Sequence, residues 1–173
     1  IDIVRDSYGV PHIFAPTDAE VAYGLAWAHA EDDFKTIQQS YLAGNNQLSK
    51  SIGNAGLGAD FIAQFIGSEA LYNKLYENEI SLAYKKVIEG YKQGINRYAA
   101  THPEELLVEG FFPITTKEMI RYAQLQLFIS SKGDQWVQRI VNNDLDYDFK
   151  AEETPKGSNT FAFNSTKTKD GST

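Results

Sequence analysis

The feature that most constrains the fold is a long helical segment near the N-terminus, TDAEVAYGLAWAHAEDDFKTIQQSYLAG, which covers residues 17–44. Thr17 and Glu20 have the spacing of a capping box, in which two side chains bond to the backbone at the start of a helix. Apolar and small residues then keep a helical spacing to about Leu42, and Gly44 is typical of a helix end. The spacing predicts one long helix over residues 17–42.

Most of the remaining chain also has a helical pattern. The segment SKSIGNAGLGAD, residues 49–60, holds three glycines and indicates a loop, in which Asp60 is placed to cap the next helix. Gly90 and Gly94 lie four residues apart, which allows another helix to approach closely. Further helices are predicted at residues 60–66, at 68–98 in one or two pieces, and at 116–143 with a kink at Gly133.

Short strands are predicted at both ends of the chain. Residues 1–6 and 12–15 alternate on either side of a Tyr8-Gly9 turn. After an acidic linker, Phe161 and Phe163 lie on one face of an alternating segment, and Asp170-Gly171 is a hairpin turn signal. A lone terminal strand would leave its backbone groups unpaired, so we expect the sequence to be the front part of a larger protein.

The composition excludes several classes of function. With 16 Lys and Arg against 23 Asp and Glu, the net charge of -7 disfavours a nucleic-acid partner. Cysteine is absent, which excludes disulfides, thiolate metal sites and a cysteine nucleophile. No apolar run approaches the ~20 residues that a membrane-spanning helix needs, so we expect no membrane span. No signal peptide is recognised.

The sequence also lacks the usual patterns of metal ligands. His12, His29 and His102 fall in a strand, a helix and a loop, without the spacing of a zinc site, and are expected to be ordinary core or surface residues. The acidic run Glu31 to Asp33 would point in three directions on a helix, which is more typical of a solvated turn than of a calcium loop. The residues themselves therefore predict no metal.

The dipeptide Gly157-Ser158 stands directly before the C-terminal alternating segment. Such a pair is most often a plain turn. It also has a coherent chemistry: attack of the Ser158 hydroxyl on the Gly157 carbonyl converts the amide into an ester, and hydrolysis leaves Ser158 with a free α-amino group. That amine, with an ordinary pKa near ~7.7–8.0, is able to act as the base for its own hydroxyl. Glycine tolerates the strained peptide that this attack requires.

Three separated motifs resemble the penicillin acylase family, whose members include acyl-homoserine lactone, aculeacin A and cephalosporin acylases. The run IVRDSYGVPHIFAPTDAEVAYGLAWAHAEDDF is similar to the start of the family's α chain, and YKQGINRYAATHPEEL and ITTKEMIRYAQLQ continue the likeness. GSNTF is similar to the Gly-Ser-Asn-x-Trp junction at which the family's precursor is cleaved, with Phe161 in place of Trp. The resemblance covers nearly the whole chain.

The resemblance implies a role for each part of the chain. Residues 1–143 would be the helical α-chain region, 144–157 a spacer that ends at the processing site, and 158–173 the first strand of a β chain whose remainder is the partner. Gly157 and Ser158 would be the processing site, and Ser158 the catalytic nucleophile. The implied fold is α+β, a mostly helical part with short N-terminal strands and a C-terminal strand that belongs to an αββα N-terminal-nucleophile hydrolase.

By the same resemblance, the end of the helix that begins near Thr116 lines the acyl pocket, and the aligned positions are Leu125, Phe128 and Ile129. Packing into the helical core is an equally expected role for them. Family members often bind calcium through an α-chain carboxylate just beyond this helix. Gln135 occupies that position, beside Asp134, so we predict no cofactor and keep calcium as an alternative.

The implied function is a self-processing amidohydrolase. It would cleave the amide between an acyl group, with fatty acyl favoured slightly, and an amine-bearing head group such as a homoserine lactone or a β-lactam nucleus. The implied location is periplasmic or secreted. We expect this chain alone to be inactive, because the family's oxyanion-hole residues lie far along the β chain. The alternative is a non-catalytic helical module that binds a ligand or a partner.

Overall fold

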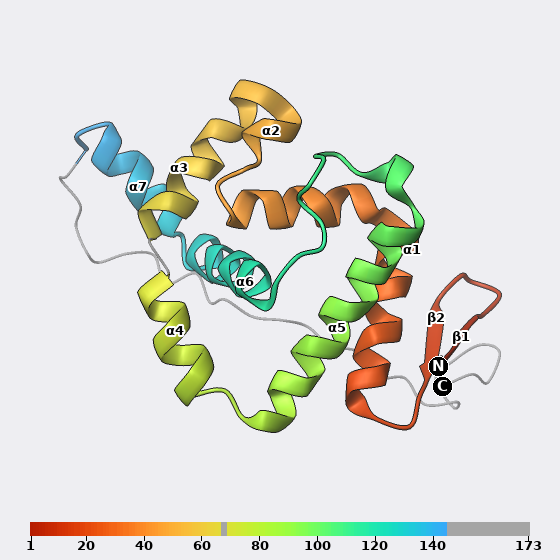
Figure 1. The fold of residues 1–173 in the computed structure, drawn as a ribbon. Coiled ribbons are helices and arrows are strands. Elements are labelled where there is room, and N and C mark those ends of the chain that lie inside the picture. The colour runs from red at the N-terminus through yellow and green to blue at the C-terminus, as the bar shows by residue number, and fades with distance from the viewer. Residues whose placement is uncertain (67–68, 145–173) are drawn as a thin grey trace, which may run out of the picture.

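The computed structural model describes residues 1–66 and 69–144, and over these residues the chain is mostly helical with one small sheet (Figure 1). The predicted spacer, the processing pair Gly157-Ser158 and the C-terminal strand lie outside the described residues. The elements in chain order are β1 Asp2–Arg5, β2 Pro11–Phe14, α1 Asp18–Gly44, α2 Ser49–Ile52, η1 Gly53–Gly56, α3 Leu57–Ile66, α4 Glu69–Asn78, α5 Leu82–Thr101, η2 Pro103–Glu105, α6 Thr116–Ser130 and α7 Gly133–Val141.

Two long helices, α1 and α5, lie side by side at the centre of the fold (Figure 1). Gly90 of α5 lies against the carbonyl group of Ala19 in α1, and Gly94 lies against that of Tyr23. Both contacts advance in the same direction along the two helices, so α1 and α5 run parallel. Neither glycine has room for a Cβ atom. The predicted close approach of a second helix at these glycines is therefore confirmed.

The hydrophobic core lies where α1, α5 and the segment before α6 meet. Leu42, Ile95 and Ile114 are among its most deeply buried side chains. Phe34 of α1 packs against Tyr98 of α5, with ring centroids 5.1 Å apart and the rings edge to face. Edge-to-face packing is a favourable geometry for aromatic pairs, so this contact adds to the stability that burial itself supplies.

Two partly or fully buried amide side chains hold the connector between α5 and α6. Gln38 of α1 donates to the carbonyl of Glu105 and accepts from the N–H of Leu107, both at 2.9 Å. Asn96 of α5 donates to the carbonyl of Ile114 and accepts from its N–H, both at 2.8 Å. These bonds pair backbone groups of a segment that has little secondary structure of its own. They therefore fix the point from which α6 starts.

The N-terminal strands form a two-stranded antiparallel hairpin, in which Ile3 is paired with Ile13. The hairpin packs on α1 at Gly24, where a Cβ atom would overlap the Ile13 side chain. Arg5 then reaches Glu31 and Asp32 of α1 at 3.2 and 2.8 Å. The prediction that the acidic run Glu31 to Asp33 is solvated is confirmed, since all three residues are exposed, and two of the three carboxylates also anchor the hairpin.

Helix α1 is kinked at Asp33, which the sequence pattern did not predict. The backbone of Asp33 is not helical, with φ −159° and ψ 71°. Its carboxylate accepts a hydrogen bond from the N–H of Thr36 at 3.0 Å, as an N-cap residue does. The hydrophobic spacing continues across Asp33, so the sequence pattern predicts one unbroken helix. The backbone instead forms two helical segments that meet at Asp33.

The loop predicted for residues 49–60 is wrong. This segment contains α2 and η1, and α3 already begins at Leu57. Asp60 does not cap α3 but lies in its first turn, and its two carboxylate oxygens accept from the N–H groups of Leu48 and Ser49 at 2.7 and 3.0 Å. The carboxylate therefore caps α2 from another helix, a tertiary contact that local spacing does not reveal.

The helix predicted over residues 116–143 is two helices, α6 and α7. Lys132 has a left-handed backbone, with φ 61°, and ends the helical path between them. Gly133 is buried against the ring of Phe128, where a Cβ atom would overlap it. The change of direction is therefore a break at Lys132 and not the kink predicted at Gly133. The helical region predicted at 68–98 is confirmed in its two-piece form, as α4 and α5.

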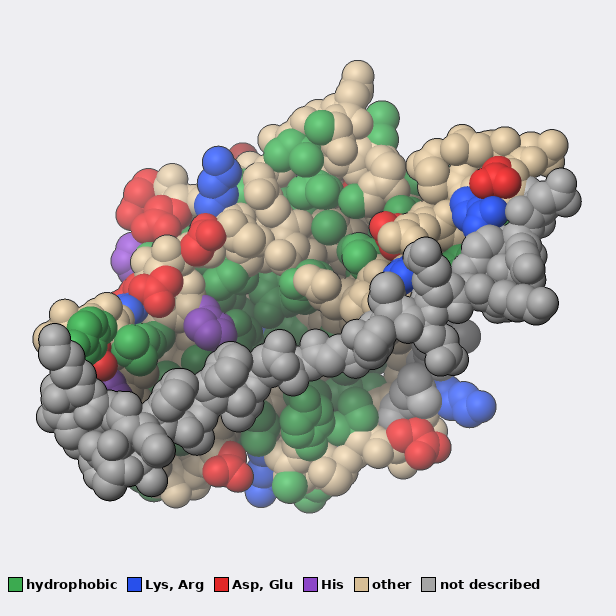
Figure 2. Space-filling view, turned by 180° about the vertical axis from the view of Figure 1, so that it is seen from behind, with side chains coloured by type: hydrophobic (Ala, Val, Ile, Leu, Met, Phe, Trp, Pro, Cys, Tyr) green, Lys and Arg blue, Asp and Glu red, His purple; other side chains and the backbone are tan. Residues whose placement is uncertain are grey.

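The described residues leave several large hydrophobic side chains exposed, and hydrophobic side chains gather over the middle of the face that Figure 2 shows. Exposed patches of this kind mark surfaces that contact another molecule or another part of the same polypeptide.

Within the part of the chain that the structure describes, no helix combines the length and the apolar character needed to cross a membrane.

Candidate functional site

Helix α6 carries the predicted pocket residues, and its position is fixed at its start. Thr115 and Glu118 form a complete capping box, in which the Thr115 hydroxyl accepts from the Glu118 N–H and the Glu118 carboxylate accepts from the Thr115 N–H. The backbone of Tyr122 lies against Gly44 of α1, where no side chain fits. The ring of Tyr122 packs edge to face on Tyr41, with centroids 5.4 Å apart.

Two of the three predicted pocket residues line the same hollow. Leu125 is buried, with 4% of its surface exposed, and Ile129 is 43% exposed. Both side chains border a hollow of about 280 Å³ between α6, the end of α1 and α2, together with Leu48 and Ile52. The hollow is smaller than most drug-sized ligand pockets, which start near ~300 Å³.

The third predicted residue, Phe128, has a different position. It does not border this hollow, and its ring instead lies directly on Gly133 at the start of α7. The family resemblance grouped the three residues, and positions i, i+3 and i+4 of a helix are expected to share one face. The structure divides the group: Leu125 and Ile129 face α1 and α2, whereas Phe128 holds α7 against α6.

The two residues at the predicted calcium position also differ from each other. Gln135 is exposed, whereas Asp134 is partly buried in the first turn of α7. One carboxylate oxygen of Asp134 is buried and makes no hydrogen bond in the described part of the chain. Calcium takes 6–8 oxygen ligands, and no group of three acidic, His or Cys side chains comes together within residues 1–66 and 69–144. Asp134 therefore fits calcium as one ligand only.

A larger apolar hollow lies on the neighbouring face of α6. It has a volume of about 640 Å³ and is bounded by α1, α4, α5 and α6. Tyr41 and Tyr91 border it, and burial raises the pKa of both phenols above the ordinary value of 10.0. The sequence pattern places Tyr91 on the apolar stripe of its helix but gives neither tyrosine a functional role. The available signals were the ten tyrosines in the composition and the apolar spacing of α5, in which Tyr84, Val87, Ile88 and Tyr91 recur every three or four residues.

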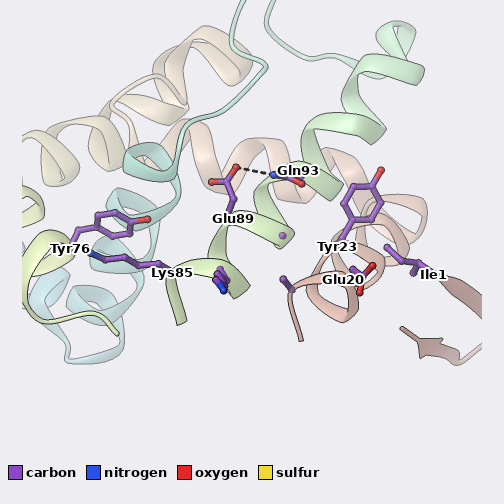
Figure 3. A pocket seen from close by; sticks show the side chains of 10 residues that line it. Ile1, Glu20, Tyr23, Tyr76, Lys85, Glu89 and Gln93 are labelled. Carbon is purple, nitrogen blue, oxygen red and sulfur yellow. Dashed lines mark hydrogen bonds between the residues drawn. The ribbon is translucent and has the colours of Figure 1, made fainter. Parts of the chain in front are cut away.

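A third hollow, of about 610 Å³, lies between the starts of α1 and α5 and is more polar (Figure 3). Glu89 accepts a hydrogen bond from Gln93 and pairs with Lys92 at 2.6 Å. Lys85 extends over the ring of Tyr76 in α4, with its nitrogen 4.9 Å from the ring centroid. These charges are matched by partners inside the protein, which is typical of a solvated groove.

Comparison with known proteins identifies the family to which the chain is similar. The Penicillin amidase family matches residues 1–173, which includes the Gly157-Ser158 pair. Acyl-homoserine lactone acylase PvdQ of Pseudomonas fluorescens is 23% identical over 153 residues, which cover 81% of this chain and 19% of that protein. Penicillin G acylase of Escherichia coli is 24% identical over 142 residues, 79% of this chain and 16% of that protein.

A solved structure has the same fold. The thermostable penicillin G acylase from Alcaligenes faecalis aligns with a TM-score of 0.62 and 18% identity, over 93% of this chain and 97% of that chain. By contrast, the chain spans only about a fifth or less of the length of the two acylases compared by sequence, PvdQ and penicillin G acylase of Escherichia coli. The match over its whole length shows that the chain belongs to the penicillin amidase family.

Proposed function

We propose that the full-length protein is a self-processing acylase that hydrolyses the amide between an acyl group and an amine-bearing head group. The observation that carries this proposal is the family match over all 173 residues, which includes Gly157-Ser158. The named relatives support the reaction class, since they are acylases of acyl-homoserine lactones and of penicillin G. A homoserine lactone or a β-lactam nucleus is the proposed head group.

The proposed processing step exchanges one bond for another. The Ser158 hydroxyl oxygen attacks the carbonyl carbon of Gly157, the C–N bond breaks as the C–O bond forms, and the amine of Ser158 takes up the proton. Water then hydrolyses the ester, which leaves a carboxylate on Gly157 and a free amine on Ser158. In turnover the same hydroxyl attacks the substrate amide with the α-amine as its base, and the head-group amine leaves with that proton. Water then hydrolyses the acyl ester on Ser158, which releases the acyl group as a carboxylate and restores the hydroxyl.

The acyl group is proposed to contact α6. Leu125 and Ile129 border one hollow with Leu48 and Ile52, and this apolar side supports a role in acyl recognition, whereas the α1 side is lined by Ala43 and the polar residues Thr36, Gln39 and Ser40. Phe128 has a supporting role in this proposal, because its ring holds α7 against the end of α6. The aliphatic character of Leu125 and Ile129 favours a fatty acyl group over an aromatic one.

The remaining features of the proposal follow from family membership. The partner is the rest of the β chain, and residues 158–173 supply the first strand of an αββα N-terminal-nucleophile hydrolase. The protein is proposed to act in the periplasm or outside the cell. No cofactor takes part in the proposed chemistry, and calcium, if bound through Asp134, would be structural.

Mass spectrometry of the full-length protein tests the proposal. The wild-type protein is expected to be cut between Gly157 and Ser158, and Ser158→Ala is expected to give one uncut, inactive chain. Ser165→Ala is the matched control, since it removes a hydroxyl seven residues away and is expected to leave the cut and the amide hydrolysis unchanged. Cleavage of Ser158→Ala at the same bond would show that another group makes the cut. An uncut, inactive wild-type protein would favour the helical binding module.

A further inference from the structure

The hollow between α6, the end of α1 and α2 has an apolar side and a polar side. The apolar side consists of aliphatic side chains from the α2 region and from α6, namely Leu48, Ile52, Leu125 and Ile129. The polar side is one face of α1, on which the bordering residues recur at helical spacing, namely Thr36, Gln39, Ser40 and Ala43. This division suits a molecule that combines a hydrocarbon part with a hydrogen-bonding group.

Two polar side chains on the α1 side have no partner among the described residues. Thr36 is already engaged, since the Asp33 carboxylate accepts hydrogen bonds from its hydroxyl and its N–H. The Gln39 amide and the Ser40 hydroxyl make no hydrogen bond within residues 1–66 and 69–144, and both residues are only partly buried. Their polar atoms are therefore available to a molecule that occupies the hollow.

The border of the hollow carries no charged side chain among the described residues. None of the residues that line it is Asp, Glu, Lys, Arg or His. A charged group bound there would lose its hydration without gaining an ion pair, which costs far more than the burial of a neutral polar group that finds a hydrogen bond. The part of a ligand that contacts this face of α1 is therefore expected to be polar and neutral.

We infer that Gln39 and Ser40 are specificity-determining residues, which select an acyl group that carries a hydroxyl or keto oxygen on the part of its chain within the hollow. The amide and the hydroxyl each offer a donor and an acceptor, so they pair with either oxygen group. The aliphatic side of the hollow contacts the hydrocarbon of the same chain. The inference rests on the proposed function and extends it, because it names the class of acyl group.

Hydrolysis of matched acyl amides by the processed full-length protein tests the inference. The amides share one head group and one chain length, and they carry a hydroxyl, a carboxylate or no substituent. The substituent is placed at successive carbons in separate amides. At its best position, the hydroxyl is expected to raise kcat/KM over the unsubstituted amide by about three- to tenfold, as one net hydrogen bond does. A carboxylate at that position should lower kcat/KM by about tenfold or more relative to the hydroxyl.

Variants of the α1 face separate hydrogen bonding from packing. Ser40→Ala and Gln39→Leu are each expected to reduce the preference for the hydroxylated amide, while the rate with the unsubstituted amide is kept or raised. Ser40→Thr keeps the hydroxyl and should keep the preference. Ser51→Ala is the matched control, because Ser51 is also a partly buried helical serine but does not border the hollow. The inference is overturned by a wild-type protein without a preference at any position, or by a preference that both Ser40→Ala and Gln39→Leu retain.

Binding separates failure of this inference from failure of the proposed function. If the wild-type protein hydrolyses none of the amides, they stay intact, and titration calorimetry measures their Kd directly. A three- to tenfold tighter Kd for the hydroxylated amide, lost in Ser40→Ala, would then keep the inference and reject the acylase, at about one net hydrogen bond. Hydrolysis without a preference would keep the acylase and overturn the inference, and so would equal Kd values or no binding of either amide in an inactive protein.

Discussion

Gly90 of α5 lies directly against the carbonyl oxygen of Ala19 in α1, and a methyl group at this position would overlap that oxygen. Gly90→Ala is therefore expected to push the two central helices apart. Overpacking of this kind costs about 1–3 kcal/mol, which urea unfolding of the full-length protein would measure.

Gly58→Ala is the control for this prediction. Gly58 also lies in a helix, but a Cβ atom there meets nothing within 4 Å. Alanine is the better helix former by about 1 kcal/mol, so Gly58→Ala is expected to be neutral or stabilising. Equal destabilisation by the two variants would mean that the close approach at Ala19 is not what requires glycine at position 90.

The cap of α2 gives a second prediction. The Asp60 carboxylate accepts from the N–H groups of Leu48 and Ser49, so Asp60→Ala leaves both donors without this partner. Loss of a cap typically costs about 0.5–2 kcal/mol. Amide exchange in α2 is expected to become faster in Asp60→Ala, while exchange in α5 is unchanged. Asp60→Asn keeps one acceptor oxygen and should give an intermediate rate. Unchanged exchange in α2 would contradict the capping role.

These contacts also explain which parts of the fold could be predicted from sequence. The start of α6 was predictable because Thr115 and Glu118 are three residues apart and cap each other locally. Helix α2 was missed because its cap comes from Asp60, eleven or twelve residues further along the chain. The kink at Asp33 was missed because the apolar spacing of α1 continues through it. Leu125 and Ile129, which the family resemblance placed together, do border one hollow, and their role in acyl binding stays a prediction. Phe128 was not, because the position of α7 decides its contact.

The buried phenol of Tyr41 gives a prediction on pH. Burial raises the pKa of Tyr41 above 10.0, so the folded state keeps a proton that the unfolded state releases. The stabilising effect is fully present below pH 10.0 and is lost as the pH rises through the folded pKa, with a slope of up to about 1.4 kcal/mol per pH unit. In Tyr41→Phe, the free energy of unfolding should therefore fall less steeply with rising pH above pH 10 than in the wild-type protein.

The control for the alkaline measurement is Tyr8→Phe, which removes a phenol that is 90% exposed. Its unfolding free energy is expected to follow the wild-type curve above pH 10. Because burial also raises the pKa of Tyr91, Tyr41→Phe should remove only part of the alkaline slope. Superimposable curves for Tyr41→Phe and the wild type would show that Tyr41 titrates alike in the folded and unfolded states.

Acyl selectivity gives the last prediction, and the structure changes which residue tests it best. Leu125 is buried against α1, so a tryptophan there would disturb packing before it reported on a substrate. Ile129 borders the same hollow but is 43% exposed, which leaves space for a larger ring. Ile129→Trp is expected to fill part of the hollow and to shorten the preferred acyl chain.

The measurement is the ratio of kcat/KM between long and short acyl amides in the processed full-length protein. One methylene in an apolar pocket is worth about 1–3 kcal/mol of discrimination, so the ratio should fall by about tenfold or more. Ile140→Trp is the control, since Ile140 is an exposed isoleucine of α7 that does not border this hollow. A ratio that stays flat in Ile129→Trp, with normal processing and folding, would assign Leu125 and Ile129 to helix packing, and acyl selectivity would then depend on residues outside this face of α6.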